Sequence, residues 1–344
     1  MHDNYRSVIH QMEAFGIEFN ARKDLPLQID LPKRKTCGLK GKFWYRLHSF
    51  QPDAGGNYIV GSFGSYKTGD YAKVEVDWKP LSEAEWRRLK AEREAAKQRG
   101  IREREKDARR AAARGAELWA EAATQGQSAY LTRKRVEPEA CRFLDDGSIV
   151  VPLIRYDRPR ADAFRGVQRI FGEKRTDKHS GAELPDKTFS KGFDPTGAAC
   201  RLGPVPPDVR VLAVCEGYAT GLSIRMATSR LVPVYVALNA GNLEHVVPIL
   251  LDLFQSARVL ICADDDWRTR NFQTKQLENV GRIKALKLSR KYDRVHVVSP
   301  AFDRRSRGDK DTDFNDLHVR EGLAVVTEQL MPVLRALGLL EQNP

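Results

Sequence analysis

The chain has 344 residues, of which 30% are charged and 41% apolar, and its 58 lysines and arginines outnumber its 46 acidic residues by 12. This length suits two domains or three small ones, and the apolar content excludes a wholly disordered chain. No apolar run reaches the roughly 18 residues of a membrane span, and the polar N-terminus leads into no signal core, so we expect no membrane partner.

Residues 1–80 have the pattern of a small α+β module. Apolar residues at helical spacing predict a helix over residues 5–15. Aromatic and glycine-rich segments at 43–47 and 55–64 are typical of short strands and tight turns. We expect the aromatic side chains here to form the core of the module rather than a base-stacking platform. They are Phe43, Trp44, Tyr45 and Trp78.

Residues 81–125 predict a charged helix that links this module to the rest of the chain. Ser82 and Glu85 form a capping-box pattern at its start. Between Glu85 and Gly115 there are 12 basic and 6 acidic residues, an excess of 6 out of the net 12. Solubility suffices to explain this charge, and nonspecific contact with phosphates is compatible with it.

Residues 126–203 predict a basic α/β subdomain. Tyr130 and Leu131 open it, and strands are expected at residues 149–154 and 164–171. A basic stretch from Lys174 to Lys191 follows these strands.

Residues 204–322 alternate apolar strands with helices, which predicts an α/β fold with a parallel sheet and flanking helices. The segment 323–344 is expected to form a closing amphipathic helix over 323–340. The strands are expected at 209–214, 232–238, 258–263 and 294–298, and the helices at 219–227, 243–254 and 275–291.

Cysteine usage argues against a zinc ribbon and against a disulfide framework. The number of cysteines is odd, and none belongs to a Cys-x-x-Cys pair or lies near a histidine at zinc-finger spacing. We therefore expect no zinc and a reducing, cytoplasmic location. The five cysteines are Cys37, Cys141, Cys200, Cys215 and Cys262.

Carboxylates follow three of the predicted strands. Glu216 follows the first strand of the sheet, Asp264 and Asp266 follow the third, and Asp313 lies in an acidic motif after the last. Ligands of open α/β sheets bind at the carboxyl ends of the strands. Clustered carboxylates repel each other unless a cation lies among them, and oxygen ligands suit Mg²⁺ or Mn²⁺. The combination predicts a divalent-metal site that acts on phosphates.

This region resembles the Toprim domain, which topoisomerases, bacterial-type primases, small nucleases and recombination mediators share. The resemblance covers about residues 208–322 and implies a metal-dependent phosphoryl-transfer site without specifying the reaction. It rests on Glu216–Gly217 and Asp264–Asp266, and more loosely on Asp311–Asp316.

The preceding segments are similar to those of primases from plasmids, integrative elements and phages. This resemblance implies a DNA primase that polymerises nucleoside triphosphates on a single-stranded DNA template, with a separate helicase as a possible partner. The chain departs from related primases in lacking a zinc ribbon and a helicase P-loop. The matching motifs are Tyr130–Leu131, Val151–Leu153, Gly166–Arg169, Lys187–Gly192, Gly197–Gly203 and, in the leader module, Gly61–Gly69.

The resemblance implies distinct roles for the acidic residues. Glu216 is expected to act as a general acid–base or to orient one metal ion. Asp264 and Asp266 would bind the metal that holds the phosphates of the incoming nucleotide, and Asp313 would complete the site. The implied reaction is attack of a 3′-hydroxyl on an α-phosphate with loss of pyrophosphate.

Four basic residues are candidates for binding template or nucleotide phosphates, although each is equally well explained as an ordinary surface residue. They are Lys134, Arg169, Lys187 and Lys191. Tyr130 and Phe189 are expected to pack under the sheet rather than to stack on bases. Asn242 is expected to cap a helix, and His318 to lie on a helix surface.

Two other functions fit the same residues. A Toprim nuclease would use the same carboxylates with water as the nucleophile, and a nucleic-acid-binding or recombination protein would use them without a metal. The basic subdomain favours the primase over the nuclease. The intact Glu216, Asp264 and Asp266 argue against the non-catalytic protein.

Overall fold

The computed structural model describes residues 2–38, 41–66, 69–77, 82–173, 175–177, 181, 183–269, 276–305 and 307–339. It contains two compact units, one with the residues up to Lys106 and the other with residues 107–269 and those from 277 onward. Several residues that the sequence predictions name lie outside the described ones: Trp78, Lys174, Lys67 and Thr68 of the Gly61–Gly69 motif, and the predicted helix ends at residues 275 and 340. Within the described ranges, no helix combines the length and the apolar character that crossing a membrane requires.

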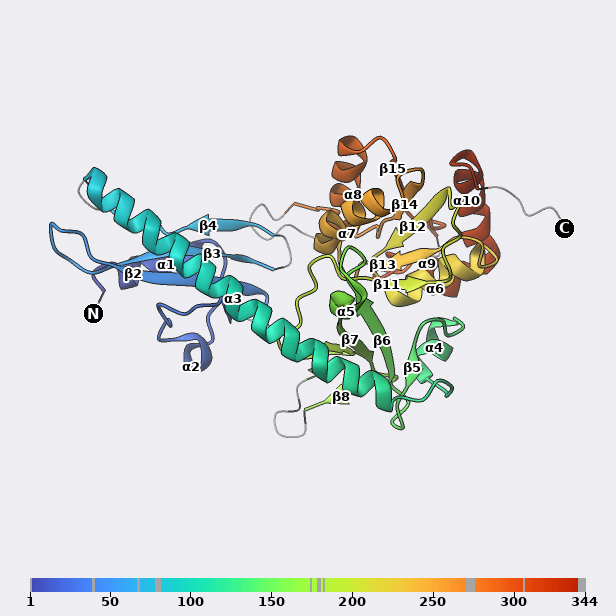
Figure 1. Cartoon of the computed structure of the whole chain (residues 1–344), viewed down its shortest axis with the longest axis horizontal. Helices are drawn as coiled ribbons and strands as arrows, with labels where there is room; N and C mark the ends of the chain where they lie inside the picture. The colour runs from blue at the N-terminus through green and yellow to red at the C-terminus, as the bar shows by residue number, and fades with distance from the viewer. Residues whose placement is uncertain are drawn as a thin grey trace. The chain divides into compact units, whose positions relative to one another are not determined.

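The N-terminal unit is built on a four-stranded antiparallel sheet of order β1-β2-β3-β4 (Figure 1). The predicted first helix is present as α1, which packs Val8 and Met12 against one face of the sheet. Phe43 and Tyr45 lie in that core and Trp44 is also buried, as predicted. The elements are α1 (Tyr5–Ala14), α2 (Ala21–Asp24), β1 (Lys35–Cys37), β2 (Phe43–Phe50), β3 (Tyr58–Ser65) and β4 (Tyr71–Lys73).

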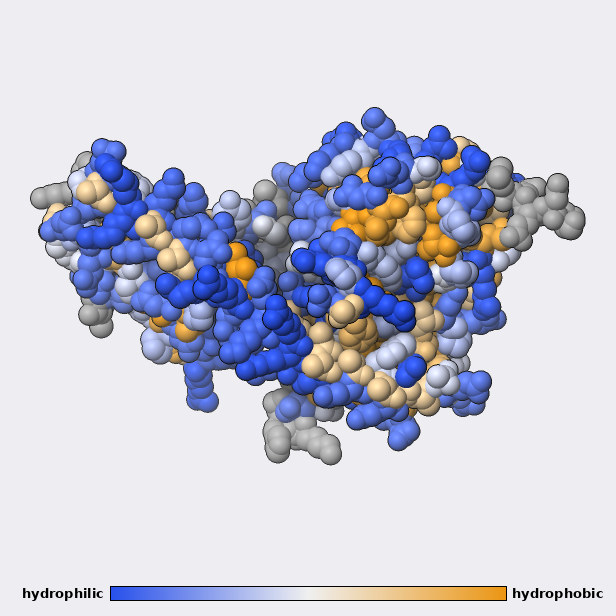
Figure 2. Space-filling view, viewed as in Figure 1, coloured by the Kyte–Doolittle hydropathy of each residue, from blue (hydrophilic) through white to orange (hydrophobic). Residues whose placement is uncertain are grey.

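Helix α3 (Glu83–Glu121) carries the charged segment. It begins at the predicted capping box, where the Ser82 amide donates to Glu85 Oε2 at 2.7 Å and the Glu85 amide donates to Ser82 Oγ at 3.3 Å. Its exposed side is largely hydrophilic (Figure 2). Because a polar helix gains little from propensity alone, its few apolar side chains decide where it packs.

A four-stranded antiparallel sheet of order β10-β7-β6-β5 begins the C-terminal unit. One face buries Ile149 and Ile170 together with Tyr130, and the other packs Val150 against Trp119 of α3. The two predicted strands are present as β6 and β7. The elements are α4 (Ala129–Lys134), β5 (Arg142–Phe143), β6 (Ile149–Ile154), α5 (Arg160–Ala163), β7 (Phe164–Ile170), β8 (Arg175–Thr176), β9 (Glu183–Leu184) and β10 (Lys187–Phe189).

The second sheet of this unit has the order β11-β13-β12-β14-β15, in which β12 to β15 pair in parallel and β11 is an antiparallel edge strand. The four predicted strands are present, each with bounds within two residues, and the α/β class is confirmed. The strands are β11 (Cys200–Leu202), β12 (Val211–Cys215), β13 (Val234–Val236), β14 (Arg258–Cys262) and β15 (Val295–Val298). The helices are α6 (Tyr218–Ala227), α7 (Ala240–Leu253), α8 (Val280–Lys291), α9 (Phe314–Glu321) and α10 (Leu323–Ala336).

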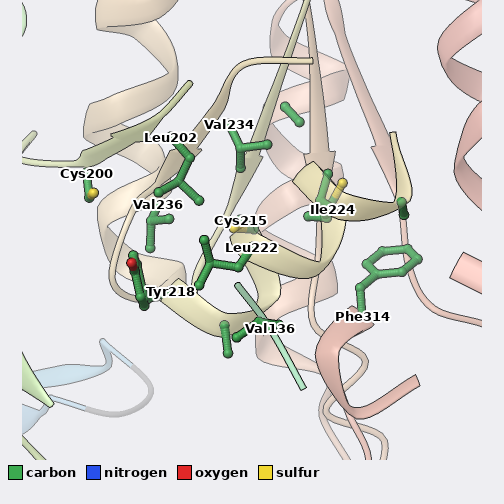
Figure 3. Packing of buried hydrophobic residues seen from close by; sticks show 14 of the residues in the cluster. Val136, Cys200, Leu202, Cys215, Tyr218, Leu222, Ile224, Val234, Val236 and Phe314 are labelled. Carbon is green, nitrogen blue, oxygen red and sulfur yellow. The ribbon is translucent and has the colours of Figure 1, made fainter. Parts of the chain in front are cut away.

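Helices cover both faces of this sheet. Figure 3 shows part of the first face, where Cys215 of β12 lies in one cluster with Leu222 of α6 and Phe314 of α9. The opposite face packs Val214 of β12 with side chains of α7 and α8, including Leu243. Adjacent residues of β12 therefore belong to different cores, as alternation along a strand requires. With both faces covered, the carboxyl edge of the sheet is the place where a ligand reaches the strands.

Candidate active site at the edge of the parallel sheet

The carboxyl edge of the parallel sheet brings two of the predicted acidic residues together. Strands β12 and β14 pair in parallel with Val214 beside Ile261, so their C-terminal ends lie at one edge. Glu216 directly follows β12, and Asp264 follows β14. A Cβ on Gly281 would lie 3.0 Å from Glu216 Oε1 and 3.1 Å from the Asp264 carbonyl oxygen, so both residues adjoin the first turn of α8.

These two carboxylates carry buried oxygens that lack partners. Within the described structure, Glu216 Oε1 and Asp264 Oδ1 are shielded from solvent and accept no hydrogen bond. Burial raises the pKa of Glu216 to about 7, and the charge of Asp266 acts in the same direction. Burial, followed by the charges of Glu216 and Asp313, raises the pKa of Asp264 well above its usual range. The edge therefore favours a proton or a cation beside these oxygens.

Asp313 joins this electrostatic cluster from the start of α9. Its Oδ1 accepts the amides of Asn315 and Asp316 at 2.7 and 2.8 Å, and Asp316 completes a reciprocal capping box. Burial and then the charge of Asp316 raise the pKa of Asp313. Since Oδ1 is engaged in the cap, Oδ2 is the atom of Asp313 that remains for a ligand.

A buried polar network fixes α9 against α6. Asn315 Nδ2 donates to Ser223 Oγ at 3.0 Å and to the Lys134 carbonyl oxygen at 2.8 Å. Ser223 Oγ also lies 3.0 Å from His318 Nδ1. His318 is buried, so its predicted surface position was wrong: a hydroxyl on the facing helix gives the ring a polar partner. The network sets the position from which Asp313 reaches the cluster.

Asp265 lies between the two predicted metal ligands but has a different environment. Its Oδ1 accepts a hydrogen bond from Asn279 Nδ2 at 2.5 Å, and its Oδ2 pairs with Arg307 Nη1 at 2.8 Å. Asp265 therefore ties the loop after β14 to the start of α8 and to the segment before α9. Adjacent positions of one acidic motif therefore differ: Asp264 has a buried oxygen without a hydrogen-bond partner among the described residues, whereas both carboxylate oxygens of Asp265 are bonded.

Two residues of α8 belong to the site and were not predicted from the sequence. The charge of Lys284 partly offsets the rise in the pKa of Glu216 that burial causes. Lys284 Nζ also lies 3.5 Å from where a Cβ on Gly241 would be, near the start of α7. Gly281, three residues earlier on the same helix face, allows α8 to approach Glu216. Their spacing of three residues, which places both on one face of a helix, was the signal in the sequence that could have identified them.

The structure does not place the four basic candidates on one surface. Lys134 Nζ lies 3.4 Å from Asp316 Oδ1, and both line a cavity of about 440 Å³ with Arg133 and Arg320. Lys187 lies on the face of its sheet opposite to Arg169, because Arg169 is paired in register with Thr188 and neighbouring side chains alternate.

The contacts of the other basic candidates lie away from the acidic residues of the edge. Arg169 Nε donates to Ser148 Oγ at 2.9 Å, and its guanidinium also pairs with Asp146 and lies over the ring of Phe171. Lys191 is exposed, and its carbonyl accepts a hydrogen bond from Arg114 of α3. Of the four, Lys134 is the one whose contacts reach the third acidic motif.

Two further expectations from the sequence were wrong. Phe189 is 42% exposed and stacks on Phe193 with ring centroids 5.0 Å apart, because β10 is an edge strand and leaves it uncovered. Helix α7 is capped by Asn239, whose Oδ1 accepts the Asn242 amide at 3.0 Å. The Asn242 side chain is instead buried and donates to the carbonyl of Ala198. Tyr130 is buried, as expected.

The donor set at the edge fits a hard divalent cation. Carboxylate oxygens are the ligands that Mg²⁺ and Mn²⁺ prefer, and two of them here are buried without a donor. Among the described residues, no three His, Cys, Asp or Glu side chains are grouped closely enough to enclose an ion. The chemistry of the ligands therefore suits a metal, and binding one requires the side chains of this edge to draw together.

Residues 211–324 match the family model of the Toprim domain. This range includes all four predicted acidic residues, Glu216, Asp264, Asp266 and Asp313. The C-terminal unit therefore contains a Toprim domain, in agreement with the resemblance in the sequence. No curated protein sequence matches the chain.

Among solved structures, the chain is similar to DNA primase catalytic domains. One is the primase fragment of the bacteriophage T7 primase-helicase protein, at 14% identity and a TM-score of 0.35, with 59% of this chain and 69% of that chain covered. Another is the DnaG primase catalytic domain bound to single-stranded DNA, at 14% identity and a TM-score of 0.32, with 67% and 75% covered. A third is the RNA polymerase domain of Mycobacterium tuberculosis primase DnaG, at 13% identity and a TM-score of 0.31, with 58% and 61% covered.

Proposed function

We propose that this protein is a DNA primase, a nucleotidyltransferase that joins ribonucleotides into short primers on single-stranded DNA. The observation that carries the proposal is the pair of buried carboxyl groups of Glu216 and Asp264, each with one oxygen that has no hydrogen-bond partner among the described residues, at the carboxyl edge of the Toprim sheet. The order of the motifs before the Toprim domain supports a primase of a plasmid, an integrative element or a phage. Such an enzyme would act in the cytoplasm beside a separate replicative helicase.

The acidic residues divide the work of the proposed site. Asp264, Asp266 and Oδ2 of Asp313 would hold Mg²⁺ or Mn²⁺, with Glu216 beside them. When bound, the metal supplies positive charge that stabilises the phosphate oxygens during transfer. Asp265 would hold the loop that carries Asp264 in place through Asn279 and Arg307.

In the proposed reaction the 3′-oxygen of the primer attacks the α-phosphorus of the incoming nucleotide. One P–O bond forms, the bond to the departing pyrophosphate breaks, and the hydroxyl proton is lost. Glu216 would accept this proton: burial raises the pKa of its carboxyl group to about 7 in the metal-free chain, and a cation bound beside it would lower that pKa and favour the carboxylate form that can act as a base. Lys284, whose charge acts on Glu216, would limit how far burial raises that pKa.

The basic residues would bind phosphates on three separate surfaces. Lys134 and Arg133 line the cavity of about 440 Å³ that also contains Asp316, and they would bind the phosphates of the nucleotide. Lys187 and the exposed Phe189 lie on one face of β10, and with Lys191 they would contact the template. Arg169, on the opposite face, would bind the template through a separate contact.

A single assay tests this function. The protein is incubated with single-stranded DNA, Mg²⁺ or Mn²⁺, and labelled ribonucleotides, and the products are separated by length. Short labelled products that disappear in the Asp264→Ala variant are expected. The Asp293→Asn variant serves as a control, because Asp293 is an exposed acid of the same unit outside the site.

The other two functions give different outcomes in this assay. Fragments of the DNA without any synthesis would indicate a Toprim nuclease, in which water replaces the 3′-hydroxyl at the same carboxylates. DNA binding that is unchanged in Asp264→Ala, with neither synthesis nor cleavage, would indicate a non-catalytic nucleic-acid-binding or recombination protein.

A further inference from the structure

One face of the N-terminal sheet carries a groove under helix α3. Side chains alternate along β2, so Arg46 and His48 lie on the face opposite to the core that contains Tyr45. Helix α3 crosses this second face (Figure 1) and packs Leu89 on Phe50. The helix covers only part of the face, and a groove of about 550 Å³ remains between the sheet and the helix.

The lining of the groove combines cations with exposed aromatic rings. Arg46 of β2, Lys73 of β4 and Lys97 of α3 line it, together with Tyr71 and Trp86. Tyr71 is 65% exposed and Trp86 is 50% exposed, in contrast to the buried aromatics of the module's core. No carboxylate is among the described residues that line the groove. Large exposed rings at such a site are characteristic of ligand contact rather than of packing.

Positive charge is concentrated around Arg46 beyond what the local acids balance. Its Nε is buried and has no hydrogen-bond partner among the described residues, although an Nη atom donates to the Ala96 carbonyl of α3. Burial, and then the charges of Arg104, Arg34 and Arg99, lower the pKa of Arg46. A cluster of guanidinium groups with a buried N–H left over favours an anionic ligand.

The acids near the groove do not neutralise it. Glu94 pairs with Lys97 at 3.7 Å, but both side chains are more than half exposed, and pairs of this kind contribute little. Glu103 lies 4.0 Å from Lys33. Lys73 and Arg46 have no such counter-charge among the described salt bridges.

We propose that this groove binds single-stranded DNA, with bases stacked on Tyr71 and Trp86 and phosphates held by Arg46, Lys73 and Lys97. Stacking platforms flanked by cations hold single strands with little sequence preference, because every base has a flat face. Bases in a duplex are paired and stacked on each other, so they are not free to contact these rings. The inference is independent of the reaction at the Toprim edge, since no residue of that edge takes part.

The test is fluorescence anisotropy with a labelled oligothymidine in EDTA, without nucleotides, on the full chain. We expect Tyr71→Ala and Trp86→Ala each to weaken binding about tenfold, whereas Trp86→Phe retains most of the affinity because a ring is kept. Lys73→Gln combined with Lys97→Gln should weaken binding and reduce its dependence on salt. Lys23→Gln removes one charge from an exposed position of the same unit and should leave binding unchanged.

Several results would overturn the proposal. They are unchanged affinity in both alanine variants, an equal loss of affinity in Lys23→Gln, and no DNA binding by the native chain, which would assign the groove to another occupant. Melting curves of each variant by circular dichroism separate loss of binding from loss of folding. Asp264→Asn should bind DNA normally in this assay. A loss of primer synthesis can therefore be distinguished from a loss of DNA binding in the groove.

Discussion

The acidic edge of the Toprim sheet and the groove of the N-terminal unit gather charge in different ways. At the edge, Glu216 and Asp264 are fixed at strand ends with buried oxygens that lack donors. In the groove, Lys73 and Lys97 are exposed beside exposed aromatic rings. Buried charge destabilises the fold until a counter-ion arrives, whereas exposed charge does not. Changes at the edge should therefore alter chemistry and stability together, and changes in the groove should alter affinity alone.

The largest effect is expected at Asp264. Replacing Asp264 with Asn should lower the rate of primer synthesis about 1,000-fold, because a neutral amide holds a divalent cation poorly beside phosphates. The same change removes an ionisable carboxyl group whose burial beside other acids raises its pKa, and with it the cost of protonating that group at neutral pH, so it should raise the melting temperature of the metal-free protein. Initial rates and calorimetric melting in EDTA measure the two effects. If Asp264→Asn lowers the rate of primer synthesis and also lowers the melting temperature, the assignment of Asp264 as a functional carboxylate with a buried oxygen that lacks a partner is contradicted.

The neighbouring Asp265 should behave in the opposite way. Asp265→Asn leaves Arg307, whose side chain is only 16% exposed, without its charge partner, so we expect a loss of about 3 kcal/mol in the free energy of unfolding. Denaturant titration of the metal-free protein measures this loss. If Asp265→Asn and Asp264→Asn shift stability in the same direction, the contrast between the two carboxylates is wrong.

The pH dependence of stability follows from the raised pKa of Glu216. In the metal-free folded protein Glu216 keeps its proton up to a pH of about 7, whereas in the unfolded chain it loses the proton near its ordinary value of 4.5. The folded state binds more protons in this range, so stability should fall by about 2 kcal/mol as the pH rises from 5 to 8. Chemical denaturation at several pH values measures the slope.

Two controls sharpen this prediction. The Glu216→Gln variant should have a flatter slope, since it has no proton to lose. Saturating Mg²⁺ should also flatten the slope of the native protein, because the cation takes over the role of the proton. The prediction is contradicted if, in EDTA, the stability of the native protein rises with pH and Glu216→Gln shows the same pH dependence.

The smallest effect is expected from the network behind the site. Ser223→Ala removes the partner of both Asn315 and His318 and should cost about 1 kcal/mol of stability. Because the network positions α9, primer synthesis should fall several-fold with little change in DNA affinity in EDTA. Thr327→Ala, which removes a hydroxyl bonded to the Ala227 carbonyl of the same helix α6, is the matched control for stability. Equal activity in the two variants would leave Ser223 with a purely structural role.

The strand ends of the Toprim region could be predicted from the sequence because apolar runs and the acids after them are local signals. The placement of Glu216 and Asp264 at one edge followed from the parallel order of the strands alone. The environment of each side chain depends on residues far along the chain. The buried ring of His318 is hydrogen-bonded to Ser223, 95 positions away, and Asp265 is paired with Arg307, 42 positions away.

The basic residues were harder to place for a related reason. Which face of a strand a residue occupies depends on register, and the register of β10 with β7 puts Arg169 and Lys187 on opposite faces. Lys284 was missed because the predicted helix places it on one face with Gly281 but does not show that this face packs against Glu216, far away in the sequence. The five-part division of the chain into segments stays a prediction.

Isothermal titration of the metal-free protein with Mn²⁺ tests most directly whether the unpartnered carboxylates form a cation site. We expect saturable binding to the native protein and to Asp293→Asn, and a loss of at least about tenfold in affinity in both Asp264→Asn and Glu216→Gln. Binding of equal strength in all four proteins, or no saturable binding to the native protein, would contradict the assignment of this edge as the metal-dependent active site.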